Sequence, residues 1–307
     1  MDFNTWNMFW RICFGFLASF IAAGNILIIC IFFKLRRRKR SSFLLIGLGV
    51  ADLLVGGLAI PLFIAGYETS SLKTVFVFER VDMFTGTSSI YTLAVISLER
   101  MFAIGWPLSH RTLNFRVYIC AIVIPWIIAV IFTILMYAGS ILDSDSVICL
   151  LVLFPTTPLL FMSVAYYVIW KKQKSRMVNH NHVIREVKLA NTLFIITGAS
   201  LLTWLPFQIL NLSASLHMNA NIPHMQLMTL IVKALQYSNS FVNVIIYPLR
   251  IPEFKNCLLH LLRCCVVPSQ VFNSGLSPLT ESGSVVSLVR FTSTQLLSPI
   301  SRQESAV

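Results

Sequence analysis

The chain has 307 residues, of which 56% are hydrophobic and only 12% are charged. A soluble protein of this length carries roughly 25% charged residues, so the composition indicates a membrane protein. A net charge of +12 would suggest nucleic acid binding in a soluble protein. Against this apolar background, basic segments that flank membrane spans are the better explanation, and no nucleic acid partner is expected. The residues before the first apolar segment do not resemble a cleavable signal peptide, so none is expected.

Seven segments are long and apolar enough to cross a bilayer, which requires about 20 mostly apolar residues. In chain order they are Ile12–Lys34, Phe43–Gly66, Lys73–Ile104, Val117–Ala138, Val147–Trp170, Val187–Ser215 and His224–Leu249. Short polar connections join them. The sequence therefore predicts an all-α fold in the form of a seven-transmembrane helix bundle.

Two further segments follow the last span. Pro252–Cys265 places apolar and polar residues at helical spacing, which predicts an eighth, amphipathic helix on the membrane surface. Beyond Pro268 the chain is rich in serine, threonine and proline, which predicts disorder. We therefore expect a membrane domain at residues 1–265 and a disordered tail at residues 266–307.

The charges in the connections predict the orientation. The first, third and fifth connections are basic, whereas the opposite side offers mainly Glu68, Asp143, Asp145 and Arg11. Basic connections remain in the cytoplasm, so we expect an extracellular N-terminus and a cytoplasmic tail. The basic residues are Lys34, Arg36, Arg37, Arg38, Lys39, Arg40, Arg111, Arg116, Lys171, Lys172, Lys174, Arg176, Arg185 and Lys188.

Ionisable side chains lie inside several of the predicted spans. Asp52 lies in the second span, Glu79 and Asp82 lie near the outer end of the third, and Glu99-Arg100 lies at its inner end. Charged groups are costly inside a bilayer and mark functional sites. These residues are therefore the first candidates for function.

At these positions the chain resembles the rhodopsin-like (class A) G-protein-coupled receptors over all seven spans. The matching motifs are Gly24-Asn25, Leu48 with Asp52, Ser97-Leu98-Glu99-Arg100-Met101, Trp126, Pro158 with Tyr166, Thr203-Trp204-Leu205-Pro206 and Asn243-Val244-Ile245-Ile246-Tyr247. Each motif alone is common, but seven in order are specific. The resemblance implies a multi-pass plasma-membrane receptor that binds a small extracellular ligand and activates a heterotrimeric G protein.

The resemblance also implies an activation switch at the cytoplasmic end. In the family, the arginine at the position of Arg100 is held at rest by acids at the positions of Glu99 and Glu186, and it changes partners on activation. A permanent salt bridge at the membrane boundary is the alternative. The other switch positions carried over are Trp204, Tyr166, Tyr247, Pro158 and Ile90.

Two switch positions depart from the family pattern. Val244 replaces a proline, which predicts a straighter seventh helix, and Ser200 replaces an aromatic residue. Altered basal signalling is expected from both changes.

Asp52 requires a cation or a proton to lie at mid-membrane. Family positions that surround a sodium ion carry oxygen-bearing side chains here, namely Ser89, Asn239, Ser240 and Asn243. The resemblance thus implies an allosteric sodium site, and a neutral, hydrogen-bonded Asp52 is the alternative. No other cofactor is expected.

Asp82 lies about five helical turns before Arg100, which puts it near the outer third of the bundle. It is therefore the most informative residue for the class of ligand. In biogenic amine receptors the aspartate at this position pairs with the ligand's ammonium, and a tyrosine at the position of Tyr237 hydrogen-bonds that aspartate. The chain is closest to these receptors in its pocket residues. The predicted ligand-binding residues are Glu79, Asp82, Thr85, Trp204, Phe207, Asn211, Lys233 and Tyr237.

Several features leave other ligands open. Lys233 can itself pair with Asp82 or Glu79, which would leave an internal ion pair that only fixes helix packing. An opsin-like retinal lysine belongs at the position of Tyr237, so retinal is not expected. The second extracellular connection is short and lacks a cysteine, and Val75 stands at the partner cysteine's place. Melanocortin and some lipid receptors also lack this disulfide, so a peptide and a lipid remain alternatives.

Outside the receptor class, a membrane transporter is the alternative. Transporters show inverted repeats and broken helices, which this sequence lacks. The histidines fall in connections or near helix ends, so no enzyme site is expected.

The segment after the last span suggests modifications and regulatory partners. Cys264 and Cys265 suit palmitoylation, and a plain apolar pair is the alternative. Serines and threonines of the tail suit phosphorylation by a receptor kinase and recruitment of arrestin.

Overall fold

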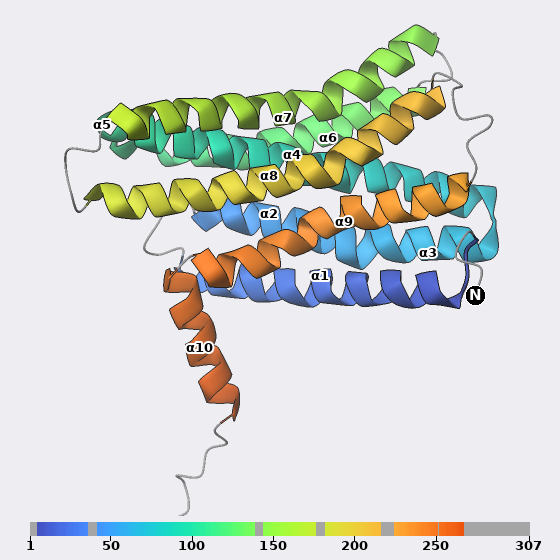
Figure 1. Ribbon diagram of the computed structural model, residues 1–307, viewed down its shortest axis with the longest axis horizontal. Helices are drawn as coiled ribbons and strands as arrows, with labels where there is room; N and C mark the ends of the chain where they lie inside the picture. Colours follow the sequence, from blue (N-terminus) through green and yellow to red (C-terminus); the bar gives the residue numbers. More distant parts are fainter. Residues whose placement is uncertain are drawn as a thin grey trace, which may run out of the picture. The chain divides into compact units, whose positions relative to one another are not determined.

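The computed structural model describes residues 5–35, 42–138, 144–175, 182–215, 224–250 and 252–266 (Figure 1). Throughout these ranges every regular element is a helix, which confirms the predicted all-α class. The elements are α1 (Met8–Leu35), α2 (Ser42–Leu54), the π-helical turn η1 (Val55–Ala59), α3 (Ile60–Thr69), α4 (Leu72–Gly105), α5 (Pro107–Arg111), α6 (Phe115–Tyr137), α7 (Ser144–Ser175), α8 (His182–Ser215), α9 (Met225–Arg250) and α10 (Pro252–Val266). The long helices begin and end within a few residues of the predicted spans.

The long helices of the unit Met1–Cys265 pack side by side, as Figure 1 shows. The continuous run from α2 through η1 to α3 acts as one helix, and α4 contacts this run as well as α6, α7 and α8. Among the described residues, five helical runs meet the length and hydropathy of a membrane span: Met8–Lys34, Ser42–Thr69, Leu72–Gly105, Phe115–Tyr137 and Leu150–Lys172. Helices α8 and α9, with 34 and 26 residues, pack against each other and complete the bundle.

Large apolar side chains cover the surface of the bundle, and polar side chains are buried in its interior beside an apolar core. Large apolar side chains such as Phe16 and Leu160 are 62% and 64% exposed. Asn25, Asp52 and Asn243, by contrast, are at most 1% exposed. This arrangement suits a lipid environment, where polar groups must find partners inside the protein.

Proline residues open the backbone hydrogen bonding at two places that shape the interior. Pro158 in α7 has no N–H to donate to the Phe154 carbonyl, and the Tyr91 hydroxyl of α4 donates to that carbonyl instead at 2.8 Å. In the second helical run, η1 ends at Ala59, and Pro61 lies in the first turn of α3. There Gly56 lets α1 approach closely, because a Cβ on Gly56 would lie 2.9 Å from the Ala22 backbone nitrogen.

Two short helices lie beyond the long runs. Helix α5 was not expected from the sequence, although Pro107 at its first turn is a typical helix start. Helix α10 covers the segment predicted to be amphipathic and buries Phe254 to 1% exposure. The Phe254 ring lies 5.3 Å from that of Phe32 and 6.1 Å from that of Tyr247. Its position on a membrane surface stays a prediction.

The antiparallel order of the long helices gives the bundle two ends, which are named here by residues of α4. The Asp82 end holds the beginning of α4, and the Arg100 end holds its last turns together with α5. Chemistry-bearing side chains gather at both ends and in a layer between them.

Candidate functional site

Asp82 is buried in α4 with 7% exposure, and both of its carboxylate oxygens are occupied by side chains of α9. Lys233 Nζ lies 2.6 Å from Asp82 Oδ2 as an ion pair, and the Tyr237 hydroxyl donates to Oδ1 at 3.0 Å. Lys233 and Tyr237 are one helical turn apart on α9, so they reach the same neighbour. The internal ion pair foreseen from the sequence is thus formed in the structure.

The Lys233 ammonium lies among aromatic rings as well as beside a carboxylate. Its Nζ is 4.1 Å from the ring centroid of Phe207 and 5.6 Å from those of Phe78 and Tyr237. It also donates to Gln236 Oε1 at 2.9 Å. Ring faces attract cations, and more strongly where water is excluded. The space next to Asp82 is therefore a well-formed site for an ammonium group.

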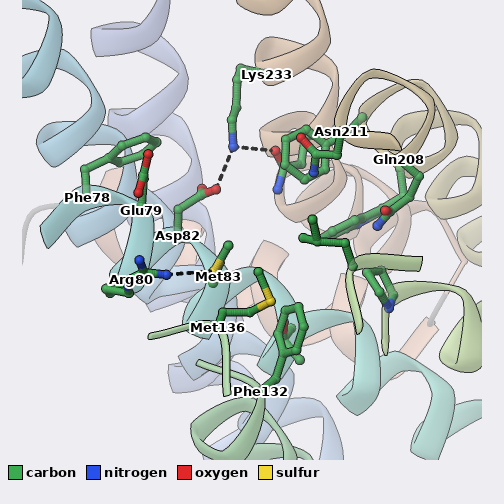
Figure 2. Close-up of a pocket in the computed structure, with 16 residues that line it drawn as sticks. Phe78, Glu79, Arg80, Asp82, Met83, Phe132, Met136, Gln208, Asn211 and Lys233 are labelled. Atoms are coloured by element: carbon green, nitrogen blue, oxygen red, sulfur yellow. Dashed lines mark hydrogen bonds and ion pairs between the residues drawn. The ribbon is translucent and has the colours of Figure 1, made fainter. Parts of the chain in front are cut away.

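A cavity of about 430 Å³ opens beside this ion pair between α4, α6, α7, α8 and α9 (Figure 2). Its volume is that of a small-molecule site. Six of the predicted ligand-binding residues line it: Glu79, Asp82, Trp204, Phe207, Asn211 and Lys233. The other two, Thr85 and Tyr237, lie deeper and border a second, smaller cavity.

Trp204 borders both cavities, as do Asp82 and Gln236. It is 5% exposed, and its ring meets that of Phe207 edge-on at 6.1 Å. Gly86 of α4 makes room for it, because a Cβ there would lie 3.0 Å from Trp204 Cη2. The larger cavity is called the upper cavity below, and the smaller one the lower cavity. The lower cavity has a volume of about 10 Å³, which is room for one water-sized sphere.

Asp52 of α2 lies in the middle of the bundle, is 0% exposed and accepts three hydrogen bonds. Ser89 and Ser240 donate to Oδ1 at 2.6 and 2.8 Å, and Asn243 donates to Oδ2 at 2.8 Å. The small cavity borders Ser89 and Ser240, and Asn243 Oδ1 is buried without a hydrogen-bond partner. These oxygens fit a sodium ion, which prefers hard oxygen ligands of this kind.

Asn239, the fifth predicted sodium residue, points to a different partner. Its Oδ1 accepts a hydrogen bond from the Ser200 hydroxyl at 2.8 Å, and both residues are at most 3% exposed. Ser200 therefore joins α8 to α9 through a polar contact, at the position where the family resemblance expects an aromatic side chain.

At the Arg100 end, Glu99 pairs with two basic side chains. Arg100 Nε lies 2.7 Å from Glu99 Oε2, and His110 Nε2 of α5 lies 2.9 Å from Oε1. The same His110 nitrogen is 3.2 Å from the Tyr118 hydroxyl of α6. The Glu99–Arg100 neighbours thus form the predicted pair, whereas the side chain of Glu186 lies outside the described residues.

The remaining switch residues are buried. Tyr247 is 2% exposed against Phe32, and Tyr166, Ile90 and Pro158 are buried as well. Ile90 and Trp204 belong to the same apolar cluster. The side chains of Cys264 and Cys265 lie outside the described residues, so their palmitoylation stays a prediction.

Sequence reasoning missed several residues of these sites. Arg80, Phe78 and Gln236 line the upper cavity, and His110 and Tyr118 surround Glu99. The helical period gave no signal for Arg80, because residues one and two positions away from Glu79 and Asp82 do not share a helix face. The Trp106-Pro107 step was the signal for α5.

The sequence matches the profile of the family described as "7 transmembrane receptor (rhodopsin family)" over residues 24–146 and 138–247. The match covers more than half of the chain. It confirms the resemblance and the seven-transmembrane bundle inferred from the sequence. It also assigns the chain to receptors rather than to enzymes or transporters.

The chain is also similar to individual receptors over most of its length. It is 30% identical to the histamine H2 receptor of Cavia porcellus, over 88% of this chain and 83% of that receptor. It is 27% identical to the alpha-1A adrenergic receptor of Mus musculus, over 81% of this chain and 66% of that receptor. The corresponding values for the 5-hydroxytryptamine receptor 2 of Aplysia californica are 27%, 90% and 81%. The chain belongs to the rhodopsin family of seven-transmembrane receptors.

Proposed function

We propose that this plasma-membrane receptor binds a small amine in the Asp82 cavity and activates a heterotrimeric G protein from the Arg100 end. The observation that carries the proposal is the place of the Lys233 ammonium, 2.6 Å from Asp82 Oδ2 and 4.1 Å from the Phe207 ring centroid. A ligand ammonium that displaces Lys233 meets the same carboxylate and the same rings. Such a group is the defining feature of a biogenic amine.

The similar receptors support an amine over the other ligand classes. Their names refer to histamine, to adrenergic ligands and to 5-hydroxytryptamine. The cavity of about 430 Å³ suits a small molecule, and its four ionisable side chains, Glu79, Arg80, Asp82 and Lys233, suit a polar one. No observation among the described residues favours the peptide or the lipid that the missing disulfide left open.

The alternative hypothesis is that the Asp82–Lys233 ion pair is permanent and only holds α4 against α9. A lysine side chain is flexible, so an ammonium from solution can replace Lys233 at a cost set by the pair's own strength. Displacement predicts that removal of the Lys233 charge strengthens amine binding. A permanent packing pair predicts lower stability and no gain for amines.

The test uses a panel of biogenic amines and measures guanine-nucleotide exchange on a purified G protein. Lys233→Met is expected to raise the potency of an active amine about tenfold, which corresponds to about 1.4 kcal/mol. Asp82→Asn is expected to lower it by at least about tenfold. Lys73→Met is the matched control, because this exposed lysine lies at the start of α4 outside the cavity. Unchanged potency in Asp82→Asn would refute the ammonium role.

The orientation is part of the proposal. Lys34, Arg111, Arg116 and the neighbouring Lys171 and Lys172 lie at helix termini of the Arg100 end. The positive-inside rule then puts this end in the cytoplasm and the N-terminus outside. An N-terminal epitope tag is expected to be stained by antibody on intact cells, and staining only after permeabilisation would reverse the orientation.

Signalling from the Arg100 end is supported by the Glu99–Arg100 pair and by the family. On activation Arg100 leaves Glu99, and the opened groove takes a helix of the G protein. The tail beyond residue 265 is proposed to recruit a receptor kinase and arrestin, and Cys264 and Cys265 are proposed palmitoylation sites. If the double variant Cys264→Ser/Cys265→Ser is still labelled by a palmitate analogue, the proposed palmitoylation sites are wrong.

A sodium ion is proposed as the allosteric ligand of the layer between the two ends. Asp52, Ser89, Ser240 and Asn243 would hold it, with Asn239 close by. The ion would supply the positive charge that a buried carboxylate requires.

A further inference from the structure

Three nitrogen donors that line the upper cavity are buried and have no hydrogen-bond partner. They are Arg80 Nε on α4, and Trp204 Nε1 and Gln208 Nε2 on α8. Buried polar groups nearly always have a hydrogen-bond partner, so three donors without one in a single cavity require an explanation. All three are donors, and a reversed Gln208 amide would not change the other two. The cavity's own side chains therefore leave all three donors unbonded.

None of the acceptors that line the cavity bonds these three donors. Asp82 accepts from Lys233 and from Tyr237, one on each oxygen. Gln236 Oε1 accepts from Lys233 as well. Figure 2 shows the Asp82–Lys233 pair above Arg80 and across the cavity from Gln208. A ligand that carries an acceptor would satisfy donors that the protein leaves unbonded.

Arg80 indicates that this acceptor is charged. Its Nη1 lies 3.7 Å from Met83 Sδ, and its guanidinium carbon lies 4.9 Å from the ring centroid of Phe76. Within the described part of the chain, no carboxylate lies within ion-pair distance of Arg80, and the adjacent Glu79 is exposed to solvent. The planar guanidinium matches a carboxylate through two parallel hydrogen bonds.

The charges of the cavity agree with this. Asp82 and Lys233 neutralise each other while they are paired. A simple amine that takes over Asp82 leaves the Lys233 and Arg80 charges in the cavity, with only the solvent-screened Glu79 nearby. A ligand that carries one positive and one negative group adds no net charge and supplies the missing anion.

We propose that the ligand is a zwitterion of the amino-acid type, with its ammonium on Asp82 and its carboxylate on Arg80. Gln208 and the Trp204 indole N–H are further donors within the same cavity. The contact between the ligand's ammonium and Asp82 rests on the proposed function. The contact between its carboxylate and Arg80 rests on the three donors that have no partner. The inference narrows the ligand from any small amine to amines that keep a carboxylate.

The experiment compares matched probes on the purified, full-length receptor by thermal shift. The pairs are phenylalanine with phenethylamine, tyrosine with tyramine, tryptophan with tryptamine and histidine with histamine. The deaminated acid of each pair, such as 3-phenylpropionate, is the third probe. At least one amino acid is expected to stabilise the receptor at about tenfold lower concentration than its amine and its deaminated acid.

Arg80→Met is expected to remove the preference for the amino acid and to leave the response to the amine within about threefold. The matched control is Arg11→Met, because Arg11 lies at the same end in an exposed pair with Glu68, outside the cavity. If Arg80→Met does not fold, the comparison of the three probes on the unaltered receptor still decides.

The outcomes separate the two proposals. An amine that stabilises more strongly than its amino acid, or a preference that survives Arg80→Met, overturns the zwitterion and leaves the amine receptor standing. A deaminated acid that equals the amino acid overturns the zwitterion and also the ammonium role of Asp82. Absence of any response to the amino acids overturns the inference.

Discussion

His110 Nε2 lies 2.9 Å from Glu99 Oε1, so a short helix that sequence reasoning overlooked holds one oxygen of the switch carboxylate. The other oxygen, Oε2, lies 2.7 Å from Arg100 Nε as an ion pair, yet that contact lacks hydrogen-bond alignment. His110 therefore competes with Arg100 for the same carboxylate. The strength of the resting Glu99–Arg100 ion pair therefore depends on the His110 side chain as well as on Arg100.

We predict that His110→Phe lowers basal signalling. Without the imidazole, Arg100 receives the whole Glu99 carboxylate and the resting pair gains about 0.5–1 kcal/mol, the upper range for a partly exposed pair. Basal nucleotide exchange on a purified G protein is expected to fall about two- to fivefold at equal receptor amounts. Tyr118→Phe is the control, because it removes the hydroxyl beside His110 and leaves the His110–Glu99 contact in place. A rise in basal exchange in His110→Phe would contradict the competition.

Ser200 and Asn239 provide the second prediction. The hydrogen bond from the Ser200 hydroxyl to Asn239 Oδ1 at 2.8 Å joins α8 to α9 inside the bundle. Its loss in Ser200→Ala leaves a buried acceptor unpaired, and interhelical bonds of this kind contribute about 0.6–1.7 kcal/mol in membranes. A lower thermal unfolding midpoint is expected.

The matched control for Ser200→Ala is Ser19→Ala. Ser19 is exposed, and its hydroxyl bonds only the Gly15 carbonyl of its own helix. Equal midpoints for the two variants would show that the Ser200–Asn239 contact does not stabilise the bundle.

Much of the fold was predictable because a bilayer imposes a simple rule. About 20 apolar residues mark a span, so the predicted Lys73–Ile104 and the observed α4 (Leu72–Gly105) differ by one residue at each end. Helix α5 was missed because five residues are too short for a periodic pattern. Only the turn-forming Trp106-Pro107 step marked its start.

The site was predictable where a residue type carries the chemistry by itself. A carboxylate inside a span, such as Asp52 or Asp82, stands out from any apolar background. Partners depend on geometry instead: the sequence left Lys233 a choice between Asp82 and Glu79, and only the packing of α9 against α4 puts it 2.6 Å from Asp82 Oδ2. Arg80 was missed because an arginine near a span end is usually solvated.

Sodium is expected to stabilise the receptor through the Asp52 cluster. Three donors converge on the Asp52 carboxylate, and the buried Asn243 Oδ1 still lacks a partner. Binding of a cation to the folded state alone raises its stability by about 1.4 kcal/mol at ten times the dissociation constant. The thermal midpoint is expected to be higher in sodium chloride than in potassium chloride at equal ionic strength.

Asp52→Asn is expected to abolish the difference between the two salts, because an amide carries no charge for the cation. Glu79→Gln serves as the control, since it removes a carboxylate that lines the upper cavity and does not border the small cavity beside Ser89 and Ser240. A sodium effect that persists in Asp52→Asn would refute this site. Equal midpoints for the unaltered receptor in both salts would favour an Asp52 that is satisfied by hydrogen bonds alone.

The last prediction concerns Gly24 of α1 and Val244 of α9. Of the glycines in α1, Gly24 is the one that lies against a side chain of α9. A Cβ on Gly24 would lie 2.5 Å from Val244 Cγ1, 2.6 Å from Cγ2 and 3.1 Å from Cβ. Rotation of the valine cannot clear this space, since both methyl groups and the branch point are close. Gly24→Ala is therefore expected to destabilise the receptor by about 1–3 kcal/mol, as overpacking does.

A double-mutant cycle separates this contact from a general intolerance of Gly24 to substitution. Val244→Ala removes the two methyl groups that an alanine at position 24 would meet, so it should restore much of the stability lost in Gly24→Ala. The expected coupling is at least about 1 kcal/mol, within the range for residues in direct contact. Gly15→Ala is the matched control, because nothing lies within 4 Å of a Cβ at that position of the same helix. Additive effects of Gly24→Ala and Val244→Ala on the unfolding midpoint would mean that α1 and α9 adjust by moving apart, and that Val244 does not set the spacing between them.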